Sequence, residues 1–318
     1  MKKFSYLNYK KILNTKTYFV AYLIVNKIKV LNIKYDLRCE LLQLCVTQYI
    51  SIHHEKIYDI PIEISYLKNL RNLLIHYNQI QEITPELCSI YSLVNINLSG
   101  NKIVVVPEYI NKLINLEILN LGGNKIFRMA PLKLPQLNEL NLSNNKLSLF
   151  PIIHAPKLTI LNLSYNAIEM IPSIIYLPSL THLLFVDNQL ISLPDELFFH
   201  TRLERLNLEQ NYIRKIPDSI MYLTNLTSLR LSQNFLTAVP SSIRNLNNLL
   251  QLYLSHNQIT VLPSEIILLP KLQEVGINNT LINVVPIGFT QTLHIIMHNE
   301  QIKNTRMFDD NVSFITII

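Results

Sequence analysis

The chain is poor in the residues that mark several common classes of protein. Its 318 residues include only five glycines and three cysteines, and 16% of them are charged. So few glycines argue against flexible linkers, and no low-complexity tract is present. The sequence also lacks a glycine-rich phosphate-binding loop, Gly-x-Ser-x-Gly and His-Glu-x-x-His. We therefore predict a protein that is not an enzyme and uses no cofactor.

The three cysteines, Cys39, Cys45 and Cys88, are an odd number. Such a set is more typical of buried or half-buried thiols than of a disulfide framework. Because free thiols persist in reducing compartments, the cysteine usage predicts a cytoplasmic protein.

One eleven-residue phrase recurs along most of the chain. Its frame, Leu-x-x-Leu-x-Leu-x-x-Asn-x-Leu, returns nine times, with Ile or Phe allowed at the apolar positions. The spacing of its asparagines, 21 to 23 residues, resembles the period of leucine-rich repeats. The pattern predicts an α/β solenoid: a leucine-rich-repeat horseshoe with a concave parallel β-sheet and short convex helices or 3₁₀ turns. The frame asparagines are Asn78, Asn101, Asn124, Asn145, Asn166, Asn188, Asn211, Asn234 and Asn257.

Each asparagine follows the expected strand and turns the chain out of it. Its side-chain amide is suited to bond buried backbone groups of its own turn and of the adjacent one. We therefore predict a structural asparagine ladder along the array. Degenerate units extend the frame at both ends, so we predict about eleven units over residues 47–292, with a C-terminal cap and tail at 293–318.

The second half of a unit reads Leu-Pro-x-x-Ile-x-x-Leu, as in residues 216–223 and 262–269. Proline followed by Asp, Glu or Ser is a helix-start signal, and the apolar spacing gives one buried stripe. We therefore expect short helices of about two turns here. The units between residues 116 and 179 are shorter and carry proline late, which favours a 3₁₀ turn instead.

Positive charge is concentrated in residues 1–46. This segment holds nine lysines and arginines and two acidic residues, a balance of +7, whereas the whole chain carries +6. The remaining residues therefore sum to −1. A repeat region so close to neutrality argues against nucleic acid as its ligand. We expect a monomer whose partner is another protein.

Residues 1–46 permit three interpretations. The apolar run at 17–25 has only nine residues, too few to span a bilayer, and no signal-peptidase site of the Ala-x-Ala kind follows it. A secretory signal and a basic anchor on a membrane surface both stay open. The sequence Asn26-Lys27-Ile28 resembles the repeat itself, so an N-terminal cap or a degenerate unit is preferred.

The third, fifth and seventh frame positions are expected to point out from the concave face. At the fifth position neutral amides dominate the middle of the array, and the character of the exposed positions changes toward the C-terminal half. Arginine and tyrosine are enriched at binding hot spots, so this region is the predicted partner-binding site. It comprises Arg205, Glu209, Arg230, Tyr253 and His256, with Tyr212 and Phe235 just past the turn.

Other candidate features are weaker. His53-His54-Glu55 has no companions at metal-ligand spacing, and the pair His294 and His298 is too small a set for zinc, so we predict no metal site. The uncharged tail at 312–318 is expected to close the last unit, or to add as an edge strand to a peptide-binding domain.

The Leu-Pro-x-x-Ile-x-x-Leu motif at a period of 23 resembles the intracellular leucine-rich-repeat proteins related to Ras-binding scaffolds. That resemblance implies a cytoplasmic adaptor in signal transduction that holds a small GTPase or a phosphatase on its concave face. We therefore expect a scaffold for protein binding. The alternative is an extracellular or secreted ligand-recognition ectodomain or effector.

Overall fold

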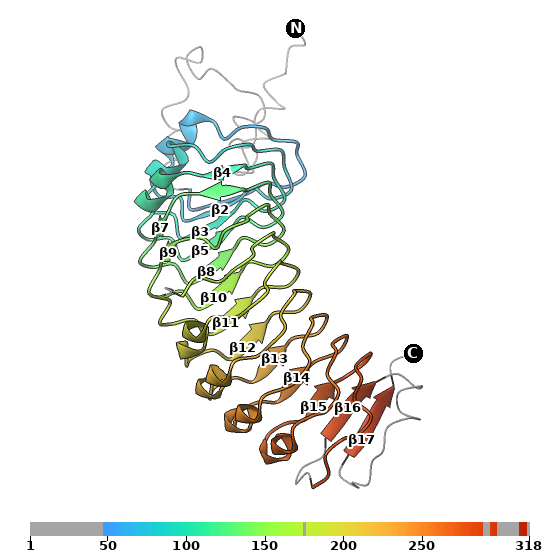
Figure 1. The fold of residues 1–318 in the computed structure, drawn as a ribbon. Helices are drawn as coiled ribbons and strands as arrows, with labels where there is room; N and C mark the ends of the chain where they lie inside the picture. Colours follow the sequence, from blue (N-terminus) through green and yellow to red (C-terminus); the bar gives the residue numbers. More distant parts are fainter. Residues whose placement is uncertain (1–46, 174–175, 289–292, 298–311, 317–318) are drawn as a thin grey trace, which may run out of the picture. The chain divides into compact units, whose positions relative to one another are not determined.

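The computed structural model describes residues 47–173, 176–288, 293–297 and 312–316, which fall into two compact units. Unit 1 contains residues up to 146 together with 151–156, and unit 2 contains 147–150 together with the described residues from 157 onward. In both units the chain winds in coils, each with one strand on one side, and Figure 1 shows successive strands side by side.

The strands of unit 1 form a parallel sheet in sequence order. Each strand covers the third to fifth frame positions, and the fourth-position residues are paired across neighbours, as in Leu73 with Ile96 and Ile96 with Leu119. The strands are β1 (Tyr49–Ser51), β2 (Asn72–Leu74), β3 (Asn95–Asn97), β5 (Ile118–Asn120) and β8 (Glu139–Asn141).

Unit 2 repeats this arrangement with the same register, for example Leu206 with Leu229 and Leu229 with Leu252. Its sheet continues beyond residue 292 through two further parallel strands, so pairing extends past the predicted end of the repeats. The domain bounds themselves stay a prediction. The strands are β10 (Ile160–Asn162), β11 (His182–Leu184), β12 (Arg205–Asn207), β13 (Ser228–Arg230), β14 (Gln251–Tyr253), β15 (Glu274–Gly276), β16 (Leu293–Met297) and β17 (Val312–Thr316).

The predicted two-turn helices are 3₁₀ helices of three or five residues, and the described residues contain no α-helix. The proline before each five-residue helix has extended backbone, as Pro217 does with a ψ of 153°, so it stands outside the helix. Only five residues then separate proline from the next buried leucine, which suits the tighter 3₁₀ turn. They are η2 (Ile62–Tyr66), η3 (Leu87–Ser89), η4 (Glu108–Lys112), η5 (Asp195–Phe199), η6 (Asp218–Tyr222), η7 (Ser241–Asn245) and η8 (Ser264–Leu268).

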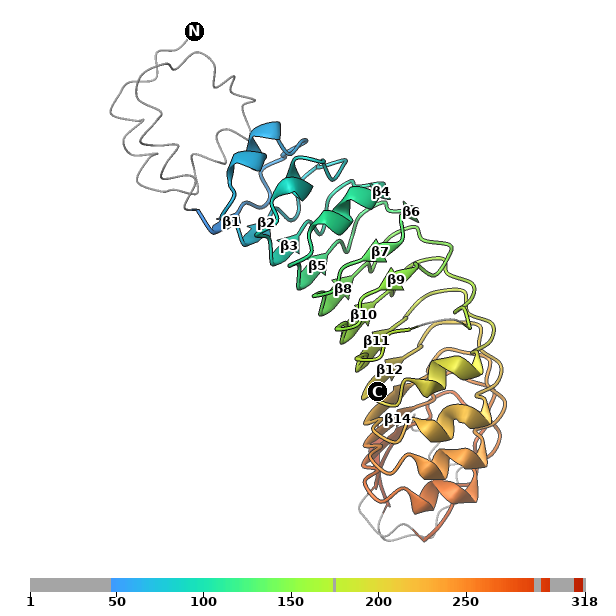
Figure 2. The same cartoon turned by 90° about the vertical axis from the view of Figure 1, so that its left-hand side faces the viewer.

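Figure 2 shows these short helices on the side opposite the strands in each unit, which defines a strand face and a helical face. No helix lies among the described residues between η4 and η5. The 3₁₀ turn expected for the shorter middle units is therefore wrong for the first two of them, and in the third the segment includes residues 174–175, which lie outside the described residues. Extended segments pair there instead, because fewer residues must cover the same path and an extended chain rises farther per residue. The pairs are β7 (Leu132–Lys133) with β9 (Ile153–His154), and β6 (Arg128–Met129) with β4 (Val105–Val106), which precedes η4 on the coil before.

The apolar frame positions form the core of each unit. Leu203, Leu206, Leu208 and Ile213 of one coil have at most 1% of their surface exposed. Their counterparts on the other coils are also buried, so each coil completes its core against its neighbours. The α/β solenoid fold with leucine-rich repeats, predicted from the sequence, is confirmed.

Cys88 lies in this core and has no exposed surface. Burial raises the pKa of its thiol to about 12, so the thiol stays protonated at neutral pH. Cys39, Cys45 and the rest of residues 1–46 lie outside the described residues. Within the described part of the chain, no helix has the length and apolar character needed to cross a bilayer.

Candidate functional site

The frame asparagines bond backbone groups of two successive coils. In unit 2, Asn234 Oδ1 accepts a hydrogen bond from the Ile213 N–H at 3.0 Å. Its Nδ2 donates to the carbonyl oxygens of Leu208, at 2.9 Å, and Leu231, at 3.1 Å. Asn101 of unit 1 makes the equivalent bonds, from the Ile80 N–H and to the Ile75 oxygen. The amide thus satisfies buried groups that the three-residue strands leave unpaired.

The residue before each of these asparagines has left-handed backbone. Examples are Gln210, Gln233 and His256, with φ of 57°, 56° and 56°. Glycine occupies the same position at Gly100 and Gly123, where φ is 66° and 67°. Sequence reasoning missed this feature, although the two glycines in the frame were a signal for it. His256, one of the predicted site residues, is therefore fixed at the turn, where Asn279 Nδ2 lies 3.3 Å from its Nδ1.

A second row of asparagines occupies the fifth frame position on the strand face. Asn97, Asn141 and Asn207 each accept a hydrogen bond through Oδ1 from the N–H two residues later, at 2.9–3.0 Å. Asn120 and Asn162 do the same. These amides close the turn after each strand, so part of their bonding capacity serves the fold rather than a ligand.

Arg230 and Tyr253 form the centre of the candidate site in unit 2. They are register partners on β13 and β14, and the Arg230 Cζ atom lies 4.7 Å from the centre of the Tyr253 ring. This is the geometry of a cation–π contact. Both side chains are half-buried, so the pair holds its shape while one side of it faces solvent.

Gly276 and Glu274 on β15 hold the tyrosine from the other side. Gly276 is the register partner of Tyr253, and a Cβ at Gly276 would lie only 2.8 Å from Tyr253 Cδ1. The missing side chain therefore leaves room for the ring. Burial raises the pKa of Tyr253 to about 12, and so do its hydrogen bond to Glu274 and the charge of that carboxylate, against the opposing effect of Arg230. Gln251 Nε2 also donates to Glu274 Oε2 at 3.1 Å.

Glu274 and Gly276 were not among the predicted site residues. Their coil carries Thr280 in place of the frame asparagine, which made it look like a degenerate end unit. The only sequence signal for their role was the small residue Gly276 at the fifth frame position, next to Tyr253. Arg230, Tyr253, Glu274 and Gly276 are named here the arginine–tyrosine cluster.

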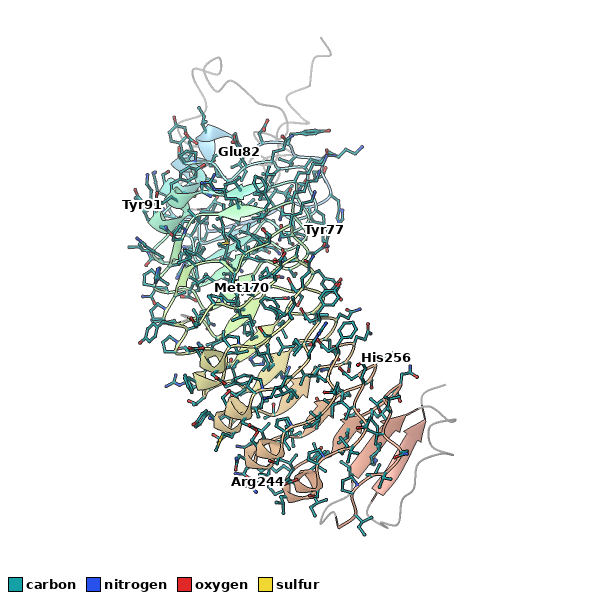
Figure 3. The ribbon with its side chains drawn as sticks, viewed as in Figure 1. Tyr77, Glu82, Tyr91, Met170, Arg244 and His256 are labelled. Atoms are coloured by element: carbon teal, nitrogen blue, oxygen red, sulfur yellow. The ribbon has the colours of Figure 1, made fainter. Side chains whose placement is uncertain are left out.

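The other predicted residues lie around this cluster or at the turn beside it. Glu209 is half-buried on the strand face, its Oε2 accepts a hydrogen bond from Asn207 Nδ2 at 3.4 Å, and its charge contributes to raising the pKa of Tyr253. Arg205 is exposed on β12. Tyr212 and Phe235 stack with ring centres 5.9 Å apart, and 51% and 43% of their surfaces are exposed. In Figure 3, Arg244 marks the helical side of unit 2 and His256 the opposite side.

Histidines gather on the first coils of unit 1. The rings of His53 and His76 stack at 4.9 Å, and those of His54 and Tyr77 also stack at 4.9 Å. Burial lowers the pKa of His76, and the charges of His53 and His54 lower it further. Among the described residues no group of three or more His, Cys, Asp or Glu is arranged to hold a metal ion. His294 is exposed on β16, and His298 lies outside the described residues.

Comparisons with known proteins agree with the repeat fold. Residues 178–236 and 224–282 match one family described as leucine rich repeat, and residues 136–155 match a second. No curated protein sequence matches the chain.

Several solved structures have a similar fold. A leucine-rich-repeat protein of Leptospira interrogans is 26% identical, with a TM-score of 0.65, over 83% of this chain and 76% of that one. The functional domain of InlJ of Listeria monocytogenes is 24% identical, with a TM-score of 0.70, over 85% of this chain and 57% of that one. A plant peptide hormone receptor, solved in complex with RGF2, is 24% identical, with a TM-score of 0.58, over 84% of this chain and 50% of that one.

Leucine-rich-repeat proteins generally act in protein–protein interaction, and the fold is typically a non-enzymatic one. In length, the chain spans about half of the InlJ and plant-receptor structures and about three quarters of the Leptospira structure. Together, the frame, the paired coils and these matches identify the described coils as leucine-rich repeats.

Proposed function

We propose that this protein is a non-enzymatic scaffold or adaptor that binds a partner protein on the strand face of unit 2. The observation that carries the proposal is the arginine–tyrosine cluster, in which Arg230 lies over the ring of Tyr253 at 4.7 Å. Large, partly apolar side chains that also form hydrogen bonds are the ones that dominate protein interfaces.

The cluster is suited to binding because its side chains are already ordered. Gly276 admits the Tyr253 ring, and Glu274 bonds it. Ordering a long side chain at an interface costs about 0.5–1.5 kcal/mol, so a pre-ordered arginine loses less on binding. Glu209 and Arg205 add charges of both signs near the cluster, which favours a partner whose surface carries both as well.

We further propose a cytoplasmic protein that takes part in signalling. The buried, free thiol of Cys88 is consistent with a reducing compartment. The resemblance to Ras-binding scaffolds adds a small GTPase or a phosphatase as candidate partners.

The alternative function, an extracellular or secreted receptor or effector, is favoured by the likeness to a plant peptide hormone receptor. N-terminal sequencing of the mature protein separates the two. Cleavage near residue 26 would favour the secreted alternative, and an intact N-terminus the cytoplasmic one.

The binding site is tested with the double variant Arg230→Glu/Tyr253→Ala in affinity capture from the protein's own cell extract. We expect the captured partner to be lost while the melting temperature changes little, because both side chains lie on the surface of the sheet. A matched control is Arg244→Glu/Tyr222→Ala, which changes the same residue types on η7 and η6 of the helical face. Equal capture by the wild type and both variants would show that the partner binds elsewhere.

A further inference from the structure

Unit 1 carries a row of lysines that lies outside the proposed binding site. Lys102, Lys125 and Lys146 each follow a frame asparagine, and all three are exposed. Their backbone N–H groups donate to Ile80, Ile103 and Ile126 of the preceding coils at 2.8, 2.9 and 2.8 Å. The three side chains therefore start in the same register on consecutive coils, about 4.8 Å apart. They are named here the lysine row.

The fold does not require lysine at this position. The same tenth frame position holds Ala167, Gln189, Tyr212, Phe235, Gln258 and Leu281 in unit 2. Side chains as different as alanine, glutamine, tyrosine and leucine occupy this position. The frame therefore requires only that the side chain points outward. Three successive lysines are thus a property of this surface and not of the repeat.

No carboxylate of the described residues is bonded to the lysine row. The residues of these coils next to the lysines, 99–104, 122–127 and 143–146, include no Asp or Glu. Lys102 Nζ donates to the neutral Gln79 Oε1 at 2.8 Å. In the part of the chain that the structure describes, no ion pair joins the three lysines to a carboxylate. Like charges this close repel one another, so an anionic partner is favoured there.

Exposed apolar side chains lie on one side of the lysine row and two glycines on the other. Val104 and Phe127 are 40% and 56% exposed, and each lies two residues beyond a lysine with a buried isoleucine between, so they share its side. The Phe127 N–H donates to the Val104 carbonyl at 3.2 Å, which places the two residues on neighbouring coils. On the other side of the lysines, Gly100 and Gly123 have no side chain, and the ring of Tyr77 lies against Gly100. Figure 3 shows Tyr77 on the side of unit 1 opposite Tyr91.

We propose that the lysine row of unit 1 binds an extended, acidic protein segment whose apolar side chains contact Val104 and Phe127. The lysines form a single row, with one lysine on each coil. This arrangement suits an extended peptide segment better than a broad anionic membrane surface. The two exposed apolar side chains beside the lysines provide contacts that a phosphate backbone would not use. The lysine row shares no residue with the arginine–tyrosine cluster, so the proposal for one site can be disproved without affecting the proposal for the other.

The test measures binding of a short fluorescent peptide of alternating Glu and Val by anisotropy, using the full chain. The triple variant Lys102→Gln/Lys125→Gln/Lys146→Gln should weaken binding at least about tenfold, and salt should weaken binding to the wild type. The matched control is Lys68→Gln/Lys112→Gln/Lys133→Gln, which removes the same charge from exposed lysines elsewhere in unit 1. It should change the affinity less than about twofold.

Phe127→Ser tests the apolar half of the site. It should weaken binding of the Glu–Val peptide and leave binding of an all-Glu peptide unchanged. Equal losses in the two triple variants would overturn the proposal, because binding would then follow net charge alone. Binding to phosphatidylserine vesicles but to neither peptide, lost in the lysine-row variant, would replace the acidic segment by a membrane surface and also overturn it.

Discussion

Units 1 and 2 are built on the same frame but present different surfaces. At the tenth frame position unit 1 carries Lys102, Lys125 and Lys146, whereas unit 2 carries the stacked pair of Tyr212 and Phe235. At the fifth position unit 1 has mainly amides that close turns, whereas unit 2 has Arg230 and Tyr253 in contact. The buried positions thus determine the coil and leave the outward positions free to vary between the units.

The strongest way to test the shared frame is to remove one ladder asparagine from each unit. Asn101→Leu and Asn234→Leu each leave a backbone N–H and at least two carbonyl groups without their amide partner. We expect each to lower the free energy of unfolding by about 3 kcal/mol, because one orphaned buried group costs about 1–3 kcal/mol. Chemical denaturation measures both. A large loss in only one unit would contradict a common structural role.

Two glycines sharpen the comparison, because they serve different purposes in the two units. Gly123 has a φ of 67°, so Gly123→Ala should cost about 1–2 kcal/mol through its backbone and leave capture of the partner by unit 2 unchanged. Gly276→Ala places a Cβ against the Tyr253 ring, and should displace the ring and weaken capture of the partner. Denaturation and affinity capture of both variants distinguish the two effects. Unchanged capture by Gly276→Ala would mean that the position of the ring does not matter for binding.

The smallest expected effect concerns pH. The pKa of Tyr253 is raised from 10.0 to about 12, so the folded protein favours the neutral phenol. This contribution to stability is present below pH 10, and it is lost as the pH rises toward 12. Tyr253→Phe removes it, so the variant should lose less stability than the wild type over that range. Tyr222→Phe on the helical face is the control, and should follow the wild type.

The sequence was sufficient to predict the solenoid fold, because nine repetitions of one frame make the buried positions plain. It was not sufficient for the outer segments. A proline followed by apolar residues at helical spacing starts either an α-helix or a 3₁₀ helix. Only five residues are available to η6, and so short a segment favours the 3₁₀ helix. In the middle coils, late prolines suggested a 3₁₀ turn, but the short path required extended pairs such as β7 with β9.

The candidate site was predicted in part. Arg230 and Tyr253 stand out by residue type on neighbouring repeats, and the structure brings their side chains into contact. Glu274 could not be predicted, because its bond to Tyr253 depends on how the ring lies beside Gly276. The position of the Tyr253 ring depends on contacts between neighbouring coils, whereas the sequence frame describes only the residues within one coil.

Site-specific photo-crosslinking tests the central claim, that the strand face of unit 2 binds the partner, most directly. A photoreactive phenylalanine is placed at position 253 in one protein and, as control, at position 222 of η6 in another. We predict a crosslinked partner from position 253 and none from position 222. A partner crosslinked from position 222 alone would contradict the account.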